Sequence, residues 1–144
     1  MDGGIELDDD PARIDVDAVH RFLSTESYWA RGRSRATVEA LVRSASRVVG
    51  VYDAGELIGF ARTVSDGLSF GWLADLYVLA AYRGRGIGLE LVREAVVRSP
   101  LKPRRWFLGT ADAHGLYAKV GFGPPSERIM ELVVADAAEP FRSP

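Results

Sequence analysis

Residues 75–88 read Asp-Leu-Tyr-Val-Leu-Ala-Ala-Tyr-Arg-Gly-Arg-Gly-Ile-Gly, and this stretch decides the fold. An apolar run ends in glycines at every second position, and a helical pattern of apolar residues follows directly. A strand that enters a helix through a glycine-rich turn directs backbone N–H groups and the positive end of the helix dipole at one point. The stretch therefore predicts an anion site, with Arg83 and Arg85 beside it as further donors.

The spacing of these glycines excludes two common phosphate-binding motifs. The dinucleotide fingerprint needs its third glycine at position 89, which is Leu89, and it normally opens the first strand–helix unit of a chain. The Walker motif needs Gly-Lys followed by Ser or Thr, which this turn lacks. The alternative without a ligand is a tight strand-to-helix turn flanked by surface arginines.

The segments around the turn indicate an α+β fold. Apolar runs over 47–52, 57–64 and 68–79 are separated by short polar turns, which predicts an antiparallel meander. A helix over 89–98 then leads to a strand over 104–110, and this helical crossover makes that strand parallel to 68–79. The other expected elements are a strand over 3–8, a helix that begins after Asp15, a helix over 36–44, a helix over 113–120 capped by Asp112, and a last strand over 128–134.

Composition limits the function classes. A length of 144 residues fits one domain, with 1–4 and 135–144 expected as tails. The absence of Cys excludes disulfides and a thiolate nucleophile, and the two His have no metal-ligand spacing, so no metal is expected. The net charge of −2 includes −6 within residues 1–17, which leaves a mildly basic remainder that suits an anionic ligand but not a nucleic acid.

The chain offers no apolar run of about 18 residues, so we expect no membrane span. Acidic residues stand where a signal peptide needs a basic region, which predicts a cytoplasmic protein.

Two motifs resemble one known family. Residues 83–88, Arg-Gly-Arg-Gly-Ile-Gly, resemble the acyl-CoA pyrophosphate motif of the GNAT superfamily of N-acetyltransferases. Residues 110–122 are similar to the short helix, Tyr and Gly-Phe turn near the end of that fold. The resemblance implies a mixed, mostly antiparallel sheet of six to seven strands flanked by about four helices. It also implies acetyl-CoA as cosubstrate and an amine of a small molecule or protein as acceptor. A non-catalytic protein that binds or senses CoA on the same fold is the alternative.

The resemblance also implies roles for residues of the opening stretch. Backbone groups of Leu76, Tyr77 and Val78 would pair with the pantetheine arm, and an amide near Val78 would polarise the thioester carbonyl. The amides that would hold the pyrophosphate belong to Arg83, Gly84, Arg85, Gly86, Ile87 and Gly88. The sequence departs from many relatives at Ala80, where they have Pro, and at 110–112, where they have Asn near the end of the fifth strand.

Two residues are catalytic candidates. Tyr117 matches the family's usual general acid, and a phenol with a pKa near ~10 holds a proton at neutral pH for a leaving thiolate. The alternative for Tyr117 is a core tyrosine on an amphipathic helix. Asp75 precedes the CoA-pairing residues and is the first candidate for a base or for positioning a water. Its alternatives are binding of the substrate ammonium and a structural salt bridge.

The acceptor is expected near a loop between the first two helices. Tyr28, Trp29, Arg31 and Arg33 place two aromatic rings and two guanidinium groups there, a composition that suits an acceptor with a carboxylate or phosphate. The alternative is that the rings fill the core and the arginines are solvated. Without Cys, direct attack by the amine is the simpler mechanism. The last strand offers an edge for a homodimer.

Overall fold

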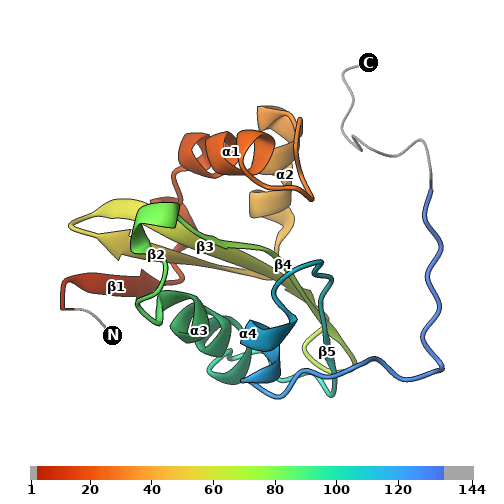
Figure 1. Ribbon diagram of the computed structural model, residues 1–144. Coiled ribbons are helices and arrows are strands. Elements are labelled where there is room, and N and C mark those ends of the chain that lie inside the picture. The colour runs from red at the N-terminus through yellow and green to blue at the C-terminus, as the bar shows by residue number, and fades with distance from the viewer. Residues whose placement is uncertain (1–2, 135–144) are drawn as a thin grey trace.

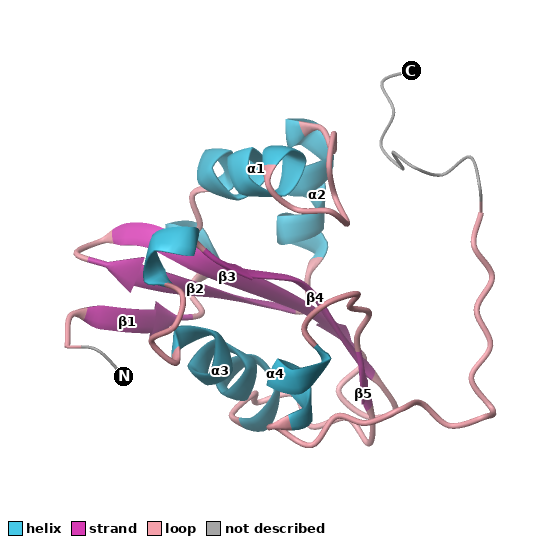
Figure 2. Cartoon of the chain, in the orientation of Figure 1, coloured by secondary structure: helices cyan, strands magenta, loops and turns pink. Residues whose placement is uncertain are grey.

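The computed structural model describes residues 3–134, and within them the chain forms one five-stranded sheet with helices on both faces (Figures 1 and 2). The strands lie in the order β1-β2-β3-β4-β5. The elements are β1 (Ile5–Asp8), η1 (Pro11–Arg13), α1 (Val16–Thr25), α2 (Arg35–Ser44), β2 (Arg47–Asp53), β3 (Glu56–Ser65), β4 (Gly71–Val78), η2 (Ala80–Tyr82), α3 (Ile87–Val92), η3 (Arg93–Val97), β5 (Trp106–Phe107) and α4 (His114–Ala118).

The α+β fold and the strand directions predicted from the sequence are confirmed. Strands β1 to β4 pair antiparallel in succession, and β5 pairs parallel to β4 after the helical crossover. The expected count of six to seven strands is wrong, because 3–134 contain five. The predicted last strand over 128–134 is irregular chain that starts in a turn and has no partner strand within 3–134 (Figure 2), and alternation alone does not supply a neighbour to pair with. Residues 1–2 and 135–144, including the predicted C-terminal tail, lie outside the described residues.

Helices cover the two faces of the sheet in pairs (Figure 1). On one face, α1 and α2 enclose a core with Phe60 and Tyr77, and on the other face α3, η3 and α4 enclose a core with Leu73 and Val78. The apolar stripe predicted for the third helix is confirmed, because all its members are buried: Ile87, Leu91, Val92, Ala95 and Val96. This helix begins two residues earlier than predicted, and its second half, η3, is π-helical.

Of two N-caps predicted from the sequence, the one at α1 is confirmed and the one at α4 is wrong. Asp15 caps α1 as predicted, because its carboxylate accepts a hydrogen bond from the Ala18 amide at 3.1 Å. Asp112 does not cap α4. The hydroxyl of Thr110 accepts the amide of Ala113 at 3.0 Å instead, and this side-chain turn leads the chain into the helix.

Strands β4 and β5 are shorter than predicted, and their ends open the site. The carboxylate of Asp66 accepts the amides of Leu68 and Ser69 at 2.8 and 2.7 Å, so the residues before Gly71 form a turn rather than a strand. β5 pairs with β4 over two residue pairs only, which involve residues 71–72 and 106–107. A Cβ at Gly71 would lie 2.5 Å from the Trp106 ring, so glycine allows this close crossing. Beyond it the two strands diverge.

Candidate active site

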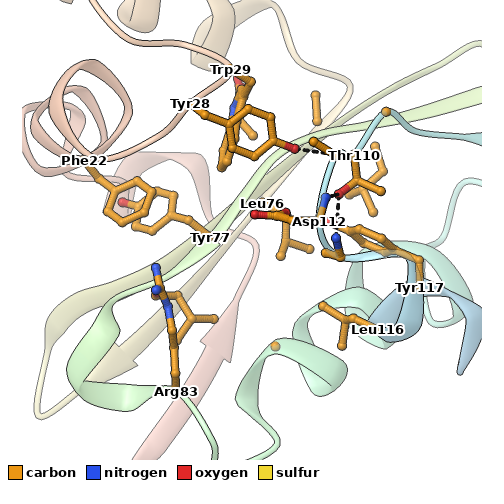
Figure 3. Close-up of a pocket in the computed structure, with 18 of the residues that line it drawn as sticks. Phe22, Tyr28, Trp29, Leu76, Tyr77, Arg83, Thr110, Asp112, Leu116 and Tyr117 are labelled. Atoms are coloured by element: carbon orange, nitrogen blue, oxygen red, sulfur yellow. Dashed lines mark hydrogen bonds between the residues drawn. The ribbon is translucent and has the colours of Figure 1, made fainter.

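A cleft of about 1050 Å³ lies where β4 and β5 diverge. It runs from the loop between α1 and α2 to the glycine turn before α3. Figure 3 shows Tyr28 and Trp29 at one end, Arg83 at the other and Leu76 between them. We call these the acceptor end and the turn end. One continuous space therefore joins the predicted acceptor loop to the predicted anion site.

The turn end is shaped by left-handed glycines. Gly84 and Gly86 both have φ of 79°, a conformation that residues with a Cβ rarely adopt. A Cβ added at either would meet no heavy atom within 4 Å, so the dihedral and not the space requires glycine. The first amides of α3, which begins at Ile87, have no acceptor inside the helix. Arg83 donates from Nε to the Val78 carbonyl at 3.0 Å, which ties the turn to the end of β4.

The edge of β4 beyond residue 72 has β3 on one side and the cleft on the other. The amide of Leu79 donates to the Ile58 carbonyl at 2.9 Å, so the backbone of Leu79 faces β3. Because successive residues of a strand direct their polar backbone groups to opposite sides, those of Val78 and Leu76 face the cleft. This edge fits an amide-containing chain lying alongside it.

A β-bulge interrupts the pairing of β4 with β3 at Asp75. Arg62 opposes Ala74 and Phe60 opposes Tyr77, so Ala61 alone faces the two residues at 75 and 76. Asp75 has φ of 55°, a left-handed conformation that Asp tolerates better than most residues. The extra residue turns the Asp75 side chain away from the alternation of the strand, toward the loop that carries Trp29 and Arg33.

Asp75 is the centre of a buried cluster at the acceptor end. Its carboxylate accepts from Trp29 Nε1 at 2.8 Å, from an Arg33 terminal nitrogen at 3.0 Å and from Arg62 Nε at 2.6 Å. The residue is 7% exposed. Burial raises the pKa of this carboxyl, but the charges of Arg62 and Arg33 and the hydrogen bonds from Arg62 and Trp29 together outweigh burial, and the net pKa lies below its ordinary value.

Arg62 was missed by the sequence analysis although a signal for it was present. It stands in β3 between Ala61 and Thr63, both buried, and an arginine inside a buried run requires a partner. Its partner, Asp75, lies on the next strand, thirteen residues along the chain. Together with Arg33 it gives the cluster two guanidinium groups for one carboxylate.

Tyr117 of α4 lines the middle of the cleft and is 9% exposed. Burial, with smaller effects of Tyr28 and Asp112, raises the pKa of its phenol to about 12, so the phenol carries its proton at neutral pH. Its ring meets Phe122 edge to face at 6.0 Å. Across the cleft, the Tyr28 hydroxyl accepts the amide of Ala111 at 2.6 Å, which joins the acceptor loop to the segment before α4.

A family model described as acetyltransferase (GNAT) domain matches residues 44–124. The chain belongs to the GNAT acetyltransferase family. The matched residues run from the end of α2 to the turn after α4 and include all of β4 and the glycine turn. The resemblance stated from the sequence is thereby confirmed.

Related proteins agree with this assignment. A candidate acetyltransferase of Gibberella zeae is 30% identical over 131 residues, and the match covers 76% of this chain and 73% of that protein. The crystal structure of a candidate GNAT-family acetyltransferase from Xanthomonas campestris pv. campestris is 36% identical, covers 90% and 93% of the two chains, and has a TM-score of 0.83. A GNAT-family acetyltransferase of Streptococcus pneumoniae, at 22% identity with 90% and 96% covered and a TM-score of 0.69, shares the fold. This GNAT chain is accordingly an acyltransferase.

The GNAT site brings most of the predicted residues into one cleft. Two predicted residues of the turn, Arg85 and Ile87, do not line it: Arg85 lies over the Tyr82 ring at 5.2 Å, and Ile87 is buried in the core. Arg31 is exposed outside the cleft. The predicted residues that do line it are Tyr28, Trp29, Arg33, Asp75, Leu76, Tyr77, Val78, Arg83, Gly84, Gly86, Gly88 and Tyr117.

Residues 3–134 contain no group of three or more His, Asp or Glu placed to hold a metal ion. They also contain no helix of the length and apolar character needed to cross a membrane.

Proposed function

We propose that this chain transfers an acetyl group from acetyl-CoA directly to the amine of a small molecule that carries an anionic group near that amine. The observation that supports the proposal is the single cleft of about 1050 Å³, which joins the glycine turn, the free edge of β4 and the cluster around Asp75. This volume is slightly above the range of about 300–1,000 Å³ for small-molecule sites, as a long donor and an acceptor together require.

Different parts of the cleft suit different groups of the acetyl donor. The left-handed turn at Gly84 and Gly86 and the start of α3 suit the pyrophosphate, because amides and the helix dipole meet there. The cleft-facing backbone groups of Leu76 suit the amides of the pantetheine arm, whereas the Val78 carbonyl already accepts from Arg83. The amide of Val78, which faces the cleft, suits the thioester oxygen as negative charge develops on it.

Acetyl transfer requires that one proton is removed from the amine and that one proton is added to the leaving sulfur. The neutral amine attacks the thioester carbon, the carbon–sulfur bond breaks, and the sulfur leaves with the electron pair of that bond. Tyr117 donates its phenolic proton in a hydrogen bond to this sulfur as the negative charge develops, and the amine gives its proton to water at the open rim of the cleft. A phenol with a pKa of about 12 is a weaker acid than a thiol with a pKa near ~8.5, so the proton moves fully to sulfur only as water, which took up the amine's proton, returns one to Tyr117.

The contacts of Asp75 bear on the base that the sequence left open. A carboxylate with three donors and a lowered pKa is a weak proton acceptor. These contacts favour the salt-bridge alternative, and we assign Asp75 the task of holding Arg33 and Arg62 in the cleft. Its role as a base stays a prediction that the variants in the Discussion test.

The charge of the cluster indicates the acceptor. Within the cluster itself, two guanidinium groups and one carboxylate leave one positive charge, and Arg33 and Arg62 both line the cleft, whose lining also includes Glu26 and Asp112. Each arginine uses one nitrogen on Asp75 and has further N–H groups for a carboxylate or phosphate. The exposed rings of Tyr28, Trp29 and Trp72 supply apolar walls beside this charge.

A thiol-release assay with acetyl-CoA and matched amines tests the proposal. Amino acids are compared with their amides, and amino phosphates with their alcohols, so that each pair differs in the anionic group alone. We expect the anionic member to have at least a tenfold higher kcat/KM, and Arg33→Met to remove this preference while the Kd for acetyl-CoA is unchanged. Equal rates within each pair refute the acceptor class. Tight binding of acetyl-CoA without thiol release from any amine, including peptide and protein amines, would favour the CoA-binding or sensing alternative.

A further inference from the structure

The chain leaves the domain after α4 as an extended arm, residues 123–134 (Figure 1). Its one hydrogen-bonded turn joins the Ile129 amide to the Ser126 carbonyl at 3.0 Å. Large apolar side chains of the arm are between 43% and 93% exposed: Ile129, Met130, Leu132, Val133 and Val134. A run of exposed apolar side chains of this kind marks an interaction surface.

A groove of about 980 Å³ lies beside β5, at the root of the arm. Its walls come from 105–110 on one side and from α4 and the turn after it on the other, and they are largely apolar, with Trp106, Leu108, Val120 and Phe122 among them. β5 pairs with β4 along one edge, and its other edge has no partner strand within 3–134. The groove therefore has the chemistry and the backbone edge to accept an apolar strand.

We propose that the arm of one copy of this chain lies in the groove of a second copy and pairs there as a strand beside β5. The second copy returns its own arm, which gives a closed, two-fold symmetric dimer. Each copy thus supplies both an arm and a groove, and within one copy the arm does not pair with β5 as a strand. The exchange gives each sheet a sixth strand, made of the residues 128–134 whose alternation predicts one.

The root of the arm explains why the occupant is a second copy rather than the arm's own chain. Pro124 and Pro125 line the end of the groove, and proline fixes φ and disfavours helical turns in the residue before it. Two prolines in succession hold the chain extended as it leaves, and the arm runs outward from the domain (Figure 1).

The exchange would also complete the active site. Gly109, Thr110 and Tyr117 line both the cleft and the groove. An arm seated in the groove packs against the side of Tyr117 that faces away from the cleft. Each copy would then support the proposed acid of the other.

The first test is the mass in solution, by size exclusion with light scattering over a range of concentrations. We expect the full chain at twice its mass of 15.7 kDa and the variant M130D/L132D at the monomer mass, because charged groups do not enter an apolar groove without a partner. Leu68→Asp changes a leucine outside the groove that is 76% exposed and is expected to leave the dimer intact. A monomeric full chain with circular dichroism of a folded protein overturns the proposal.

The second test asks whose groove the arm occupies. The natural chain has no Cys, so single cysteines report without background. Arg105→Cys places one on the exposed rim of the groove and Glu131→Cys places one on the arm. The two single variants are co-expressed and treated with a short bis-maleimide, which tolerates a shift in register. A covalent heterodimer is expected. A double variant that links only within one chain, at monomer mass, shows the arm folded onto its own domain and refutes the exchange.

Discussion

Replacing Asp75 separates its charge from its backbone conformation. Asp75→Asn keeps the shape and the tolerance of a left-handed φ but leaves Arg33 and Arg62 without their anion. Removal of one member of a buried ion pair costs about 3–5 kcal/mol. The arginine side chains are 19% and 13% exposed and keep some water, so we expect the lower part of this range, about 3 kcal/mol.

Asp75→Ala adds the backbone term. A residue with a plain Cβ at φ of 55° costs roughly 1–2 kcal/mol, so this variant should be less stable than Asp75→Asn by about that amount. Asp75→Gly loses the same charge as Asp75→Ala, but glycine adopts this φ without strain. Urea unfolding at pH 7, followed by circular dichroism and fluorescence, measures the three free energies of unfolding.

The pH dependence has a definite sign. Because the pKa of Asp75 is lower in the folded protein than in the unfolded chain, its contribution to stability is complete above the unfolded pKa of about 3.9 and is lost as the pH falls toward the folded pKa. The difference in stability between the natural chain and Asp75→Asn should therefore narrow below about pH 4. The ion-pair role would be refuted by two results together. One is a free energy of unfolding of Asp75→Asn within 0.5 kcal/mol of that of the natural chain, which is roughly the effect of an ordinary surface change. The other is that kcat of Asp75→Asn no longer rises with pH, which would establish Asp75 as a base.

Two further predictions concern the donor and the proton. Tyr117→Phe should lower kcat about a hundredfold or more and leave the Kd for acetyl-CoA nearly unchanged, as thiol release and calorimetry would measure; an unaltered kcat removes Tyr117 from the chemistry. Gly84→Ala and Gly86→Ala should each weaken acetyl-CoA binding about tenfold, since alanine resists their φ of 79°. Gly88→Ala is the matched stability control, because its Cβ would make an ordinary 3.8 Å contact with Leu116. An alanine in a helix adds roughly 0.5–1 kcal/mol to the free energy of unfolding relative to glycine. Equal losses of stability at Gly84, Gly86 and Gly88 would contradict the explanation by φ.

Features with a local cause could be predicted from the sequence. The glycine turn, the cap at Asp15 and the apolar stripe of the third helix each depend on residues within a few positions of one another. The crossover to a parallel fifth strand follows from chain connectivity. These features were sufficient to identify the family and the turn end of the cleft.

Features set by distant partners could not be predicted. β5 spans two residues rather than seven because β4 diverges from it, and no pattern within 104–110 records that divergence. The bulge at Asp75 and the pairing of its carboxylate with Trp29 and Arg33 join segments 46 and 42 residues apart. The predicted strand over 128–134 has the right composition, but whether it pairs depends on an edge elsewhere.

The two-residue pairing of β4 with β5 has a consequence for the survival of the empty protein. Backbone groups at an open strand edge are templates on which other chains add strands, and sheet proteins normally shield such edges. Here the edge that faces the cleft cannot be closed by a permanent neighbour, because under the proposed function the pantetheine arm has to lie there. Bound acetyl-CoA would then also protect this edge of β4 from the addition of strands by other chains. A cell short of acetyl-CoA would hold this protein in its most aggregation-prone form, so its lifetime would follow the supply of its own substrate.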